Sequence, residues 1–310
     1  MRIAVVGAGA VGGYFGARLA QGGAELVVIA RGAHLDAIRR EGLRITSVAG
    51  DAVVHPVECA DDPAGLPPVD VVLLGVKAWQ VADAVGILGP LLAPDGCVLP
   101  LQNGVEAPAQ IDRALGPGRA LGGLCRILSE LVAPGAIKHS GVEPYVAFGE
   151  LTGVASERTR RLLAAFERAP GVRAELVPDI RLAMWRKFLL ITAWGAVGAS
   201  TRATIGQILG DPGLRGRLLD AMGEIQAVGR ALGVPLTDDD LRYAMTVLEG
   251  APAEGTTSMQ RDLAGGRPSE LDAQIGAVVR FGQELGVAVP YHAGVLRQLQ
   301  EAGRPGRLAG

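Results

Sequence analysis

The spacing of hydrophobic residues changes once along the chain and divides it into two parts. In the first part, short apolar runs of strand length alternate with segments of helical periodicity. Strands are predicted at residues 2–6, 25–31, 43–48, 52–58, 69–76, 97–102, 120–128, 131–138, 144–149 and 172–177, with helices ending at 21, covering 33–40 and 79–88, starting near 105, and covering 156–168. This alternation predicts an α/β domain with a doubly wound, mostly parallel sheet.

In the second part the periodicity is helical throughout, which predicts an all-α domain. Helices are expected at residues 179–199, 203–209, 214–232, 237–249, 255–264, 269–285 and 290–301. Asp179, Thr237 and Ser269 are predicted N-caps, and Gly233 is predicted to end a helix. We therefore expect one domain over residues 1–178 and a second over residues 179–310.

A glycine pattern joins the first predicted strand to the first predicted helix. Gly7, Gly9 and Gly12 fit G-x-G-x-x-G between a strand and a helix, the context in which this motif indicates dinucleotide binding. The alternative is an export signal, with Arg2 as its positive start, but such a signal has no need of glycines at these places. We predict a Rossmann domain whose turn, made of Gly7, Ala8, Gly9, Ala10, Val11 and Gly12, binds a pyrophosphate.

The end of the second predicted strand bears on the choice of cofactor. NAD-binding sites carry an acidic residue there, whereas this sequence reads "VVIARGAH" and carries Arg31. An arginine suits a 2′-phosphate, which favours NADP(H); the alternative is a solvated arginine with NAD as the cofactor. Lys77 and Asn103 directly follow two further predicted strands, where ligands bind in open α/β sheets, although either could be an ordinary loop residue.

Composition excludes several classes of partner. The chain has 310 residues, 49% of them hydrophobic, and a net charge of −2, which argues against nucleic acid or a polybasic membrane contact. The best apolar run, at 188–200, is too short to span a membrane. We predict buried thiols in a reducing cytoplasm for Cys59, Cys97 and Cys125. No metal site is expected, and surface or loop positions are predicted for His34, His55, His139 and His292.

Four further segments carry a family resemblance. They are "VKAWQVADAV" at 76–85, "LQNGVE" at 101–106, "MWRKFLL" at 184–190 and "TSMQRDLAGGRPSELD" at 257–272. Together with the glycine motif, they make the chain resemble the ketopantoate reductase family over nearly its whole length. The resemblance implies a Rossmann domain, a helical domain and an active site in the cleft between them. It also implies the NADPH-dependent reduction of ketopantoate to pantoate, a step of pantothenate biosynthesis.

The resemblance also implies roles for individual residues. Lys187 would be the general acid, because an ammonium can stabilise the negative charge that develops on a keto oxygen and then donate a proton. Glu270 would bind the substrate hydroxyl and Ser258 its carboxylate. Asn103 would lie near the nicotinamide and the substrate, and Arg31 with Lys77 would hold the phosphate end of NADP.

Each of these assignments has a structural alternative. Lys187 could extend from an apolar helix to solvent, and Glu270, with Asp272, could simply complement the start of a helix. Ser258 could be an ordinary helix serine. Trp185 is predicted to belong to the core.

The chain departs from the family at three positions. Ile191, Gly195 and Gly255 stand where the family commonly has asparagine, and the first two should line the same helix wall as Lys187, as substrate-binding positions. Nearby polar side chains could replace the lost amides; the candidates are Thr192, Gln260 and Gln274. Otherwise the substrate is a less polar 2-keto acid or an imine. A non-catalytic NADPH-binding protein is a further alternative. A small 2-keto acid, and a second copy of the chain in a homodimer, are the expected partners.

Overall fold

The computed structural model describes residues 1–302, which form two compact units. One unit comprises Met1–Gln102 with Glu106–Arg181, and the other comprises Asn103–Val105 with the chain from Leu182 onward. The first unit ends at Arg181, close to residue 179, where the hydrophobic pattern becomes helical throughout. The hydrophobic pattern did not indicate that Asn103–Val105 belongs to the second unit.

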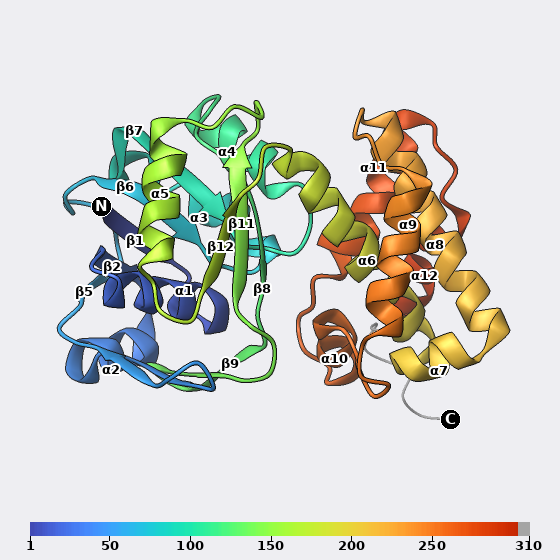
Figure 1. Ribbon diagram of the computed structural model, residues 1–310, viewed down its shortest axis with the longest axis horizontal. Helices are drawn as coiled ribbons and strands as arrows, with labels where there is room; N and C mark the ends of the chain where they lie inside the picture. Colours follow the sequence, from blue (N-terminus) through green and yellow to red (C-terminus); the bar gives the residue numbers. More distant parts are fainter. Residues whose placement is uncertain (303–310) are drawn as a thin grey trace. The chain divides into compact units, whose positions relative to one another are not determined.

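A parallel five-stranded sheet forms the centre of the first unit, in the order β5-β2-β1-β6-β7 (Figure 1). Its strands are β1 (Arg2–Val6), β2 (Glu25–Ile29), β5 (Glu58–Ala60), β6 (Val69–Leu74) and β7 (Leu92–Pro100). β1, β6 and the second half of β7 are almost entirely buried, so their sequences are mostly apolar, whereas β5 at the edge of the sheet has no buried residue. The predicted doubly wound α/β fold is therefore confirmed for this part of the chain.

Helices cover both faces of the central sheet. On β1, Ile3 and Val5 belong to a cluster with residues of α1 (Ala10–Gln21), α2 (Gly32–Glu41) and α5 (Glu157–Glu167). Ala4 and Val6 point the other way, into a cluster with α3 (Val81–Val85) and α4 (Ala107–Leu115). Short 3-10 turns at Ala78–Gln80 and Gly89–Leu91 flank α3, so the helix predicted at 79–88 is interrupted.

The remaining strands form two small mixed sheets rather than extending the parallel one. The first has the order β4-β3-β10-β9 and the second the order β12-β11-β8. Their bounds are β3 Leu43–Ser47, β4 Ala52–Val54, β8 Leu121–Arg126, β9 Ser129–Ala133, β10 Ala136–His139, β11 Tyr145–Glu150 and β12 Arg173–Leu176. The single strand predicted at 131–138 was wrong, because Gly135 has φ +71° and turns the chain into an antiparallel pair.

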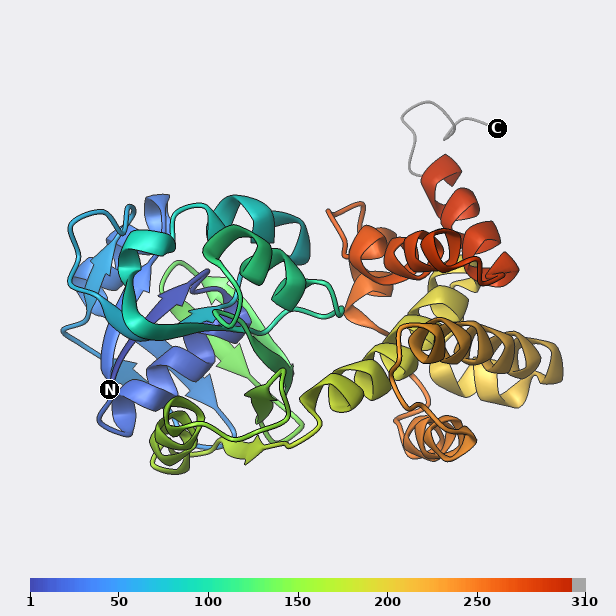
Figure 2. The ribbon, with the colours of Figure 1, turned by 90° about the horizontal axis from the view of Figure 1, so that it is seen from above.

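The second unit is helical (Figure 2). Its helices are α6 (Ile180–Thr201), α7 (Ile205–Gly210), α8 (Pro212–Ala231), α9 (Asp238–Glu249), α10 (Ser258–Ala264), α11 (Ala277–Leu285) and α12 (Pro290–Ala302), with a π-helical turn at Asp272–Gly276 before α11. Its core includes Trp185, as predicted, packed edge-on against Phe188 with ring centroids 5.4 Å apart. Within residues 1–302, no helix combines the length and apolar character needed to cross a membrane.

Helix ends agree with the predicted caps in part. The Thr237 backbone N–H donates to Asp240 Oδ2 over 2.7 Å at the start of α9, and Gly233, with φ +77°, follows the end of α8. Two starts were predicted wrongly. α10 begins at Ser258 rather than at residue 255, and the helix predicted from Ser269 begins at Leu271.

Two of the four histidines contradict the surface prediction. His139 lies in β10 at 2% exposure and pairs with Ser47 Oγ at 2.7 Å and the Val142 carbonyl at 2.9 Å. His292 is fully buried, with Nδ1 2.6 Å from Glu224 Oε2. Hydrogen-bond partners supplied by distant segments make this burial possible.

The cysteines follow their prediction in part. Cys97 and Cys125 are buried, whereas Cys59 is half-buried. Burial raises the pKa of the Cys97 thiol to about 12.

Candidate functional site

The glycine turn between β1 and α1 is closely packed at two of its three glycines. Gly7 has φ +86°, and a methyl group built on it would lie 2.5 Å from the Val76 backbone nitrogen. A methyl group on Gly12 would lie 2.4 Å from the Gly7 carbonyl oxygen and 3.2 Å from Gly75 Cα. Only glycine fits at either position, so the turn is tight and α1 approaches the end of β6 closely.

Gly9 is different, because the space beside it is open. No atom lies within 4 Å of a methyl group built there. Gly9 is the N-cap of α1, which has no acidic residue in its first turn. The first N–H groups of a helix have no intrahelical acceptor, and with the helix dipole they favour an anion. The turn therefore has both the donors and the room that a pyrophosphate needs.

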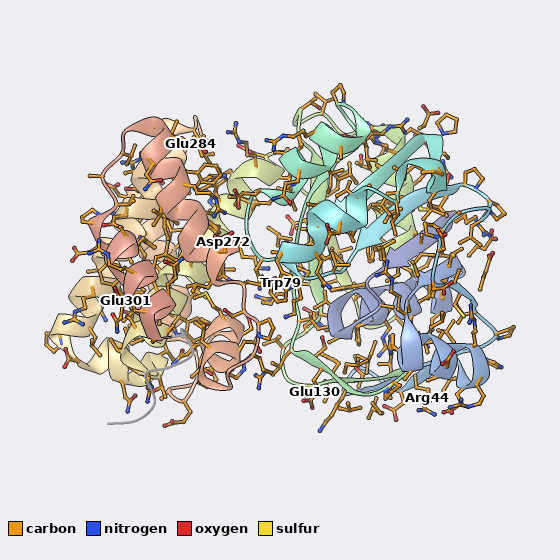
Figure 3. All side chains as sticks on the ribbon, turned by 180° about the vertical axis from the view of Figure 1, so that it is seen from behind. Arg44, Trp79, Glu130, Asp272, Glu284 and Glu301 are labelled. Carbon is orange, nitrogen blue, oxygen red and sulfur yellow. The ribbon has the colours of Figure 1, made fainter. Side chains whose placement is uncertain are left out.

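The strand order places this turn at the switch point of the sheet. The chain runs from β1 to β2 on one side and later continues through β6 and β7 on the other. Ligands of open α/β sheets bind at the carboxyl ends of strands at this point. The glycine turn follows β1 and exposed Lys77 follows β6, with its Nζ 6.0 Å from the ring centroid of Trp79. The exposed side chain of Trp79 is labelled in Figure 3. Exposed Arg31 follows β2 as the N-cap of α2.

A buried glutamine that sequence reasoning did not single out joins the ends of two strands. Gln102 Nε2 donates to the carbonyl of Leu74 over 2.7 Å and to that of Val76 over 2.9 Å. It thereby ties the segment after β7 to the end of β6, just before Asn103. Its place inside the "LQNGVE" segment was the available signal.

In the second unit, two predicted site residues come together although they are far apart in sequence. Asn103 Nδ2 donates to Glu270 Oε2 over 3.2 Å, and Glu270 is 8% exposed. Gly104 has φ +116°, and a methyl group on it would lie 3.2 Å from the Ala273 carbonyl oxygen. The Asn-Gly turn therefore lies against the helical turn that follows Glu270, a close approach that needs glycine.

The alternative for Glu270, a simple helix-start charge, fits less well. Glu270 directly precedes the first helical residue, where a helix-start charge is expected, but its Oε2 also accepts a hydrogen bond from the Asn103 amide of another segment. Asp272 does not complete a capping box with it, because its Oδ1 accepts from Arg280 over 2.7 Å.

The helix α6 carries the predicted proton donor. Lys187 and Ile191 are half-buried, and Gly195, two steps of four residues after Lys187, is buried. A methyl group on Gly195 would meet Met259 Cε at 2.7 Å, Thr257 Oγ1 at 3.5 Å and Gln274 Oε1 at 3.7 Å. Gln274, at 2% exposure, thus lies where a side chain at position 195 would point. It is one of the three replacements predicted for the lost amides.

Buried polar atoms without a hydrogen-bond partner lie on α6 and on α10, which packs beside it. Thr192 Oγ1, Trp194 Nε1 and Gln260 Oε1 are buried and have no hydrogen-bond partner among residues 1–302. The other end of the Gln260 amide donates to the Ala203 carbonyl over 3.0 Å. Gln260 Oε1 lies 2.4 Å from where a methyl group on Gly198 would stand.

Two further predicted positions lie near the start of α10. A methyl group on Gly255 would lie 2.8 Å from the Pro252 carbonyl oxygen, so the backbone excludes an asparagine there. Ser258 is exposed, and the cap of α10 is Thr257, whose Oγ1 accepts from the Gln260 backbone N–H over 3.1 Å. Over residues 1–302, no cluster of three or more His, Cys, Asp or Glu side chains is suited to a metal ion.

Comparison with known proteins covers both units. Residues 3–153 match the family ketopantoate reductase PanE/ApbA, and residues 179–302 match ketopantoate reductase PanE/ApbA C terminal. The 2-dehydropantoate 2-reductase of Mesorhizobium japonicum is 34% identical, covering 91% of this chain and 92% of its own. The crystal structure of a PanE/ApbA family ketopantoate reductase from Ralstonia eutropha JMP134 has 33% identity and a TM-score of 0.87 over 98% of both chains.

One further solved structure shares the fold. It is a D-mandelate dehydrogenase with NADH and anilino(oxo)acetate, 21% identical, with a TM-score of 0.87 over 98% of both chains.

Proposed function

This chain belongs to the ketopantoate reductase family of oxidoreductases, and from that premise we propose that it reduces 2-dehydropantoate to pantoate with NADPH and with Lys187 as the proton donor. The observation that carries the proposal is the hydrogen bond between Asn103 and Glu270. It joins two residues that the substrate chemistry needs, and it holds the carboxylate of Glu270 in a nearly buried position. A carboxylate so oriented can accept a hydrogen bond from a substrate hydroxyl.

The first unit supplies the residues for the cofactor. The N–H groups of residues 7–12 hold the pyrophosphate, and the open space at Gly9 admits it. Arg31 and Lys77 hold the 2′-phosphate, since an arginine at the end of β2 takes the place of the acidic residue that NAD sites carry. When bound, the nicotinamide supplies a hydride to the keto carbon.

The second unit supplies the proton and the substrate contacts. Lys187 is half-buried on α6, and an ammonium in a site that excludes water acts more strongly on a developing oxyanion than one in open solvent. It stabilises the negative charge on the keto oxygen and transfers a proton to it as the C=O bond becomes C–OH. Ser258 binds the substrate carboxylate, and Asn103 orients Glu270.

A second candidate substrate has support from a specific contact. Position 195 presents no side chain and faces the Met259 methyl group, while position 191 is isoleucine. This apolar surface favours a 2-keto acid with a larger or less polar side chain than ketopantoate. Gln274 beside the same position argues for ketopantoate, because its amide takes the place of an asparagine.

The test is steady-state kinetics on ketopantoate and a panel of branched 2-keto acids, with NADPH and NADH in parallel. We expect turnover with NADPH and loss of the NADPH preference in Arg31→Ala. Lys187→Ala should lower kcat by about 10³-fold while leaving NADPH affinity intact. Lys138→Ala, which removes an exposed lysine of β10, is the matched control.

Three outcomes would contradict the proposal. Full activity in Lys187→Ala would remove the proton donor. A higher kcat/KM on a branched keto acid than on ketopantoate would favour the second substrate. NADPH binding without any turnover would indicate a non-catalytic protein.

Two earlier expectations remain predictions. A cytoplasmic location and pairing of two chains are proposed here only by analogy with the enzyme class. Sedimentation of the native chain checks the second of them.

A further inference from the structure

A histidine outside the glycine motif holds one of the carbonyl groups of the glycine turn. His34 lies in the first turn of α2, and its Nε2 is 2.8 Å from the Ala8 carbonyl oxygen. On the other side of the ring, the Gly135 backbone N–H donates to Nδ1 over 3.0 Å. A backbone N–H can only donate, so Nδ1 accepts, and the ring carries its proton on Nε2, which donates to Ala8.

A serine anchors the same turn from a second segment. Ser129 Oγ, in β9, donates to the Ala10 carbonyl over 3.0 Å. In the adjoining strand, Ile137 Cδ1 lies 2.5 Å from where a methyl group on Gly13 would stand. The antiparallel pair β9 and β10 therefore packs directly against the start of α1.

These contacts act on the groups that would face a phosphate. In a planar trans peptide, the C=O and the following N–H point in opposite directions. A hydrogen bond that fixes the Ala8 carbonyl therefore also fixes the direction of the Gly9 N–H. The bond to Ala10 does the same for the Val11 N–H. Gly9 is the N-cap of α1, so its N–H has no acceptor within the helix, and the space beside the residue is open.

From this geometry we propose that His34 and Ser129 are cofactor-positioning residues, which aim the amides of the glycine turn at the pyrophosphate of the dinucleotide. His34 has a second effect, because Arg31 begins the same helix. One imidazole thus sets the glycine turn and the start of α2 relative to each other. The inference rests on the proposed function only in that the protein binds a nicotinamide dinucleotide.

The test is the dissociation constant of NADPH, followed by nicotinamide fluorescence, with thermal unfolding measured on each variant. His34→Ala should weaken NADPH binding about five- to tenfold, the loss of one well-oriented hydrogen bond. Ser129→Ala should weaken it about twofold, because α1 itself already orients the Val11 N–H. In kinetics, KM for NADPH should rise while kcat and KM for ketopantoate stay unchanged.

Two conservative variants separate the hydrogen bonds of the ring. The amide nitrogen of His34→Gln can reach the Ala8 carbonyl as Nε2 does, so this variant should restore affinity. The oxygen of His34→Asn can accept from Gly135 but leaves Ala8 without its donor, so affinity should stay low. His139→Ala is the control, since it removes from β10 another imidazole with two hydrogen bonds, and this ring contacts Tyr14 of α1 but makes no hydrogen bond to the turn.

The results distinguish this inference from the proposed function. If the native protein binds neither NADPH nor NADH, the proposed function fails. If it binds NADPH, and His34→Ala binds it equally well, only the positioning role is overturned. An equal loss of affinity in His139→Ala would also overturn it, because the effect would then be a general loosening of the fold. Should His34→Ala fail to fold, the comparison of His34→Gln with His34→Asn decides.

Discussion

The two units of this protein assemble their candidate sites by different means. In the first, the central feature is a continuous turn of six residues, shaped by glycine, whose backbone amides are the proposed donors to a pyrophosphate. In the second, the features are side chains from segments far apart, such as Asn103 and Glu270, joined by a hydrogen bond. The residues of a site made of backbone amides are neighbours in the sequence. A site made of side chains from distant segments forms only when the chain folds.

Glycine has two different roles within each unit. At Gly7 a backbone nitrogen leaves no room for a side chain, whereas the space beside Gly9 is open, as the proposed binding of a pyrophosphate requires. In the second unit, Gly255 faces a backbone carbonyl and Gly195 faces the end of a methionine side chain. In this comparison, the protein backbone requires glycine at Gly7 and Gly255, but it does not require glycine at Gly9 or Gly195.

The largest effect is expected for a pair of variants in the first unit. Gly7→Ala should lower the free energy of unfolding by about 3 kcal/mol, because alanine meets both an unfavourable φ and the Val76 backbone. Gly9→Ala should leave stability nearly unchanged but weaken NADPH binding, because its methyl group occupies the approach of the pyrophosphate. Urea unfolding and NADPH titration measure the two effects.

The opposite result for either variant would contradict this difference between Gly7 and Gly9. An unchanged free energy of unfolding in Gly7→Ala would show that the turn can accommodate a side chain at this position. Unchanged NADPH binding in Gly9→Ala would show that the phosphate lies elsewhere.

An intermediate effect is expected for the corresponding pair in the second unit. Gly255→Asn should lower the free energy of unfolding by about 2 kcal/mol, because its Cβ meets the rigid Pro252 carbonyl. Gly195→Asn should be tolerated, because the Met259 methyl group can move aside. The added amide beside Gln274 should also shift substrate preference toward ketopantoate.

Thermal unfolding checks the two stability predictions. The kcat/KM for ketopantoate divided by that for a branched keto acid checks the predicted shift in substrate preference. A larger loss of stability in Gly195→Asn than in Gly255→Asn would contradict them. An unchanged substrate ratio would remove position 195 from the substrate site.

The smallest effect concerns a carboxylate that stabilises the helical unit. Glu224 accepts hydrogen bonds from the backbone N–H groups of Tyr291 and His292, over 2.7 and 3.0 Å, and pairs with the His292 ring. Burial alone would raise the pKa of Glu224, but these hydrogen bonds outweigh it and lower the pKa below its usual 4.5.

The sign of the pH dependence follows from this pKa. A carboxyl with a lowered folded pKa stabilises the fold above its unfolded pKa of 4.5, and this contribution is lost as the pH falls through the lower folded value. Glu224→Gln should cost about 1 kcal/mol at neutral pH and flatten the acid side of the stability curve. Asp220→Asn removes an exposed carboxyl from the same helix as the control. An unchanged acid slope in Glu224→Gln would contradict the assignment.

The sequence predicted β1, β2, β6 and part of β7 in the central sheet, and the helical second unit, because each has a distinct hydrophobic period. It missed β5, because the single strand expected at 52–58 is divided between β4 and β5, which belong to different sheets. It missed the turn at Gly135 as well: Pro134 and Gly135 form a turn signal, but the apolar residues on both sides resemble one continuous strand. It also placed His139 and His292 on the surface, because a polar residue is buried only if a distant partner satisfies it.

The sequence by itself determined the glycine turn, the cation at the end of β2 and the family, because these depend on residue type and local spacing. Tertiary structure alone decided that Asn103 meets Glu270, that Gln274 lies beside Gly195 and that His34 reaches the carbonyl of Ala8. These contacts join positions between 26 and 167 residues apart. Their geometry depends on how whole helices and strands pack together, so it cannot be predicted from the local spacing of hydrophobic residues.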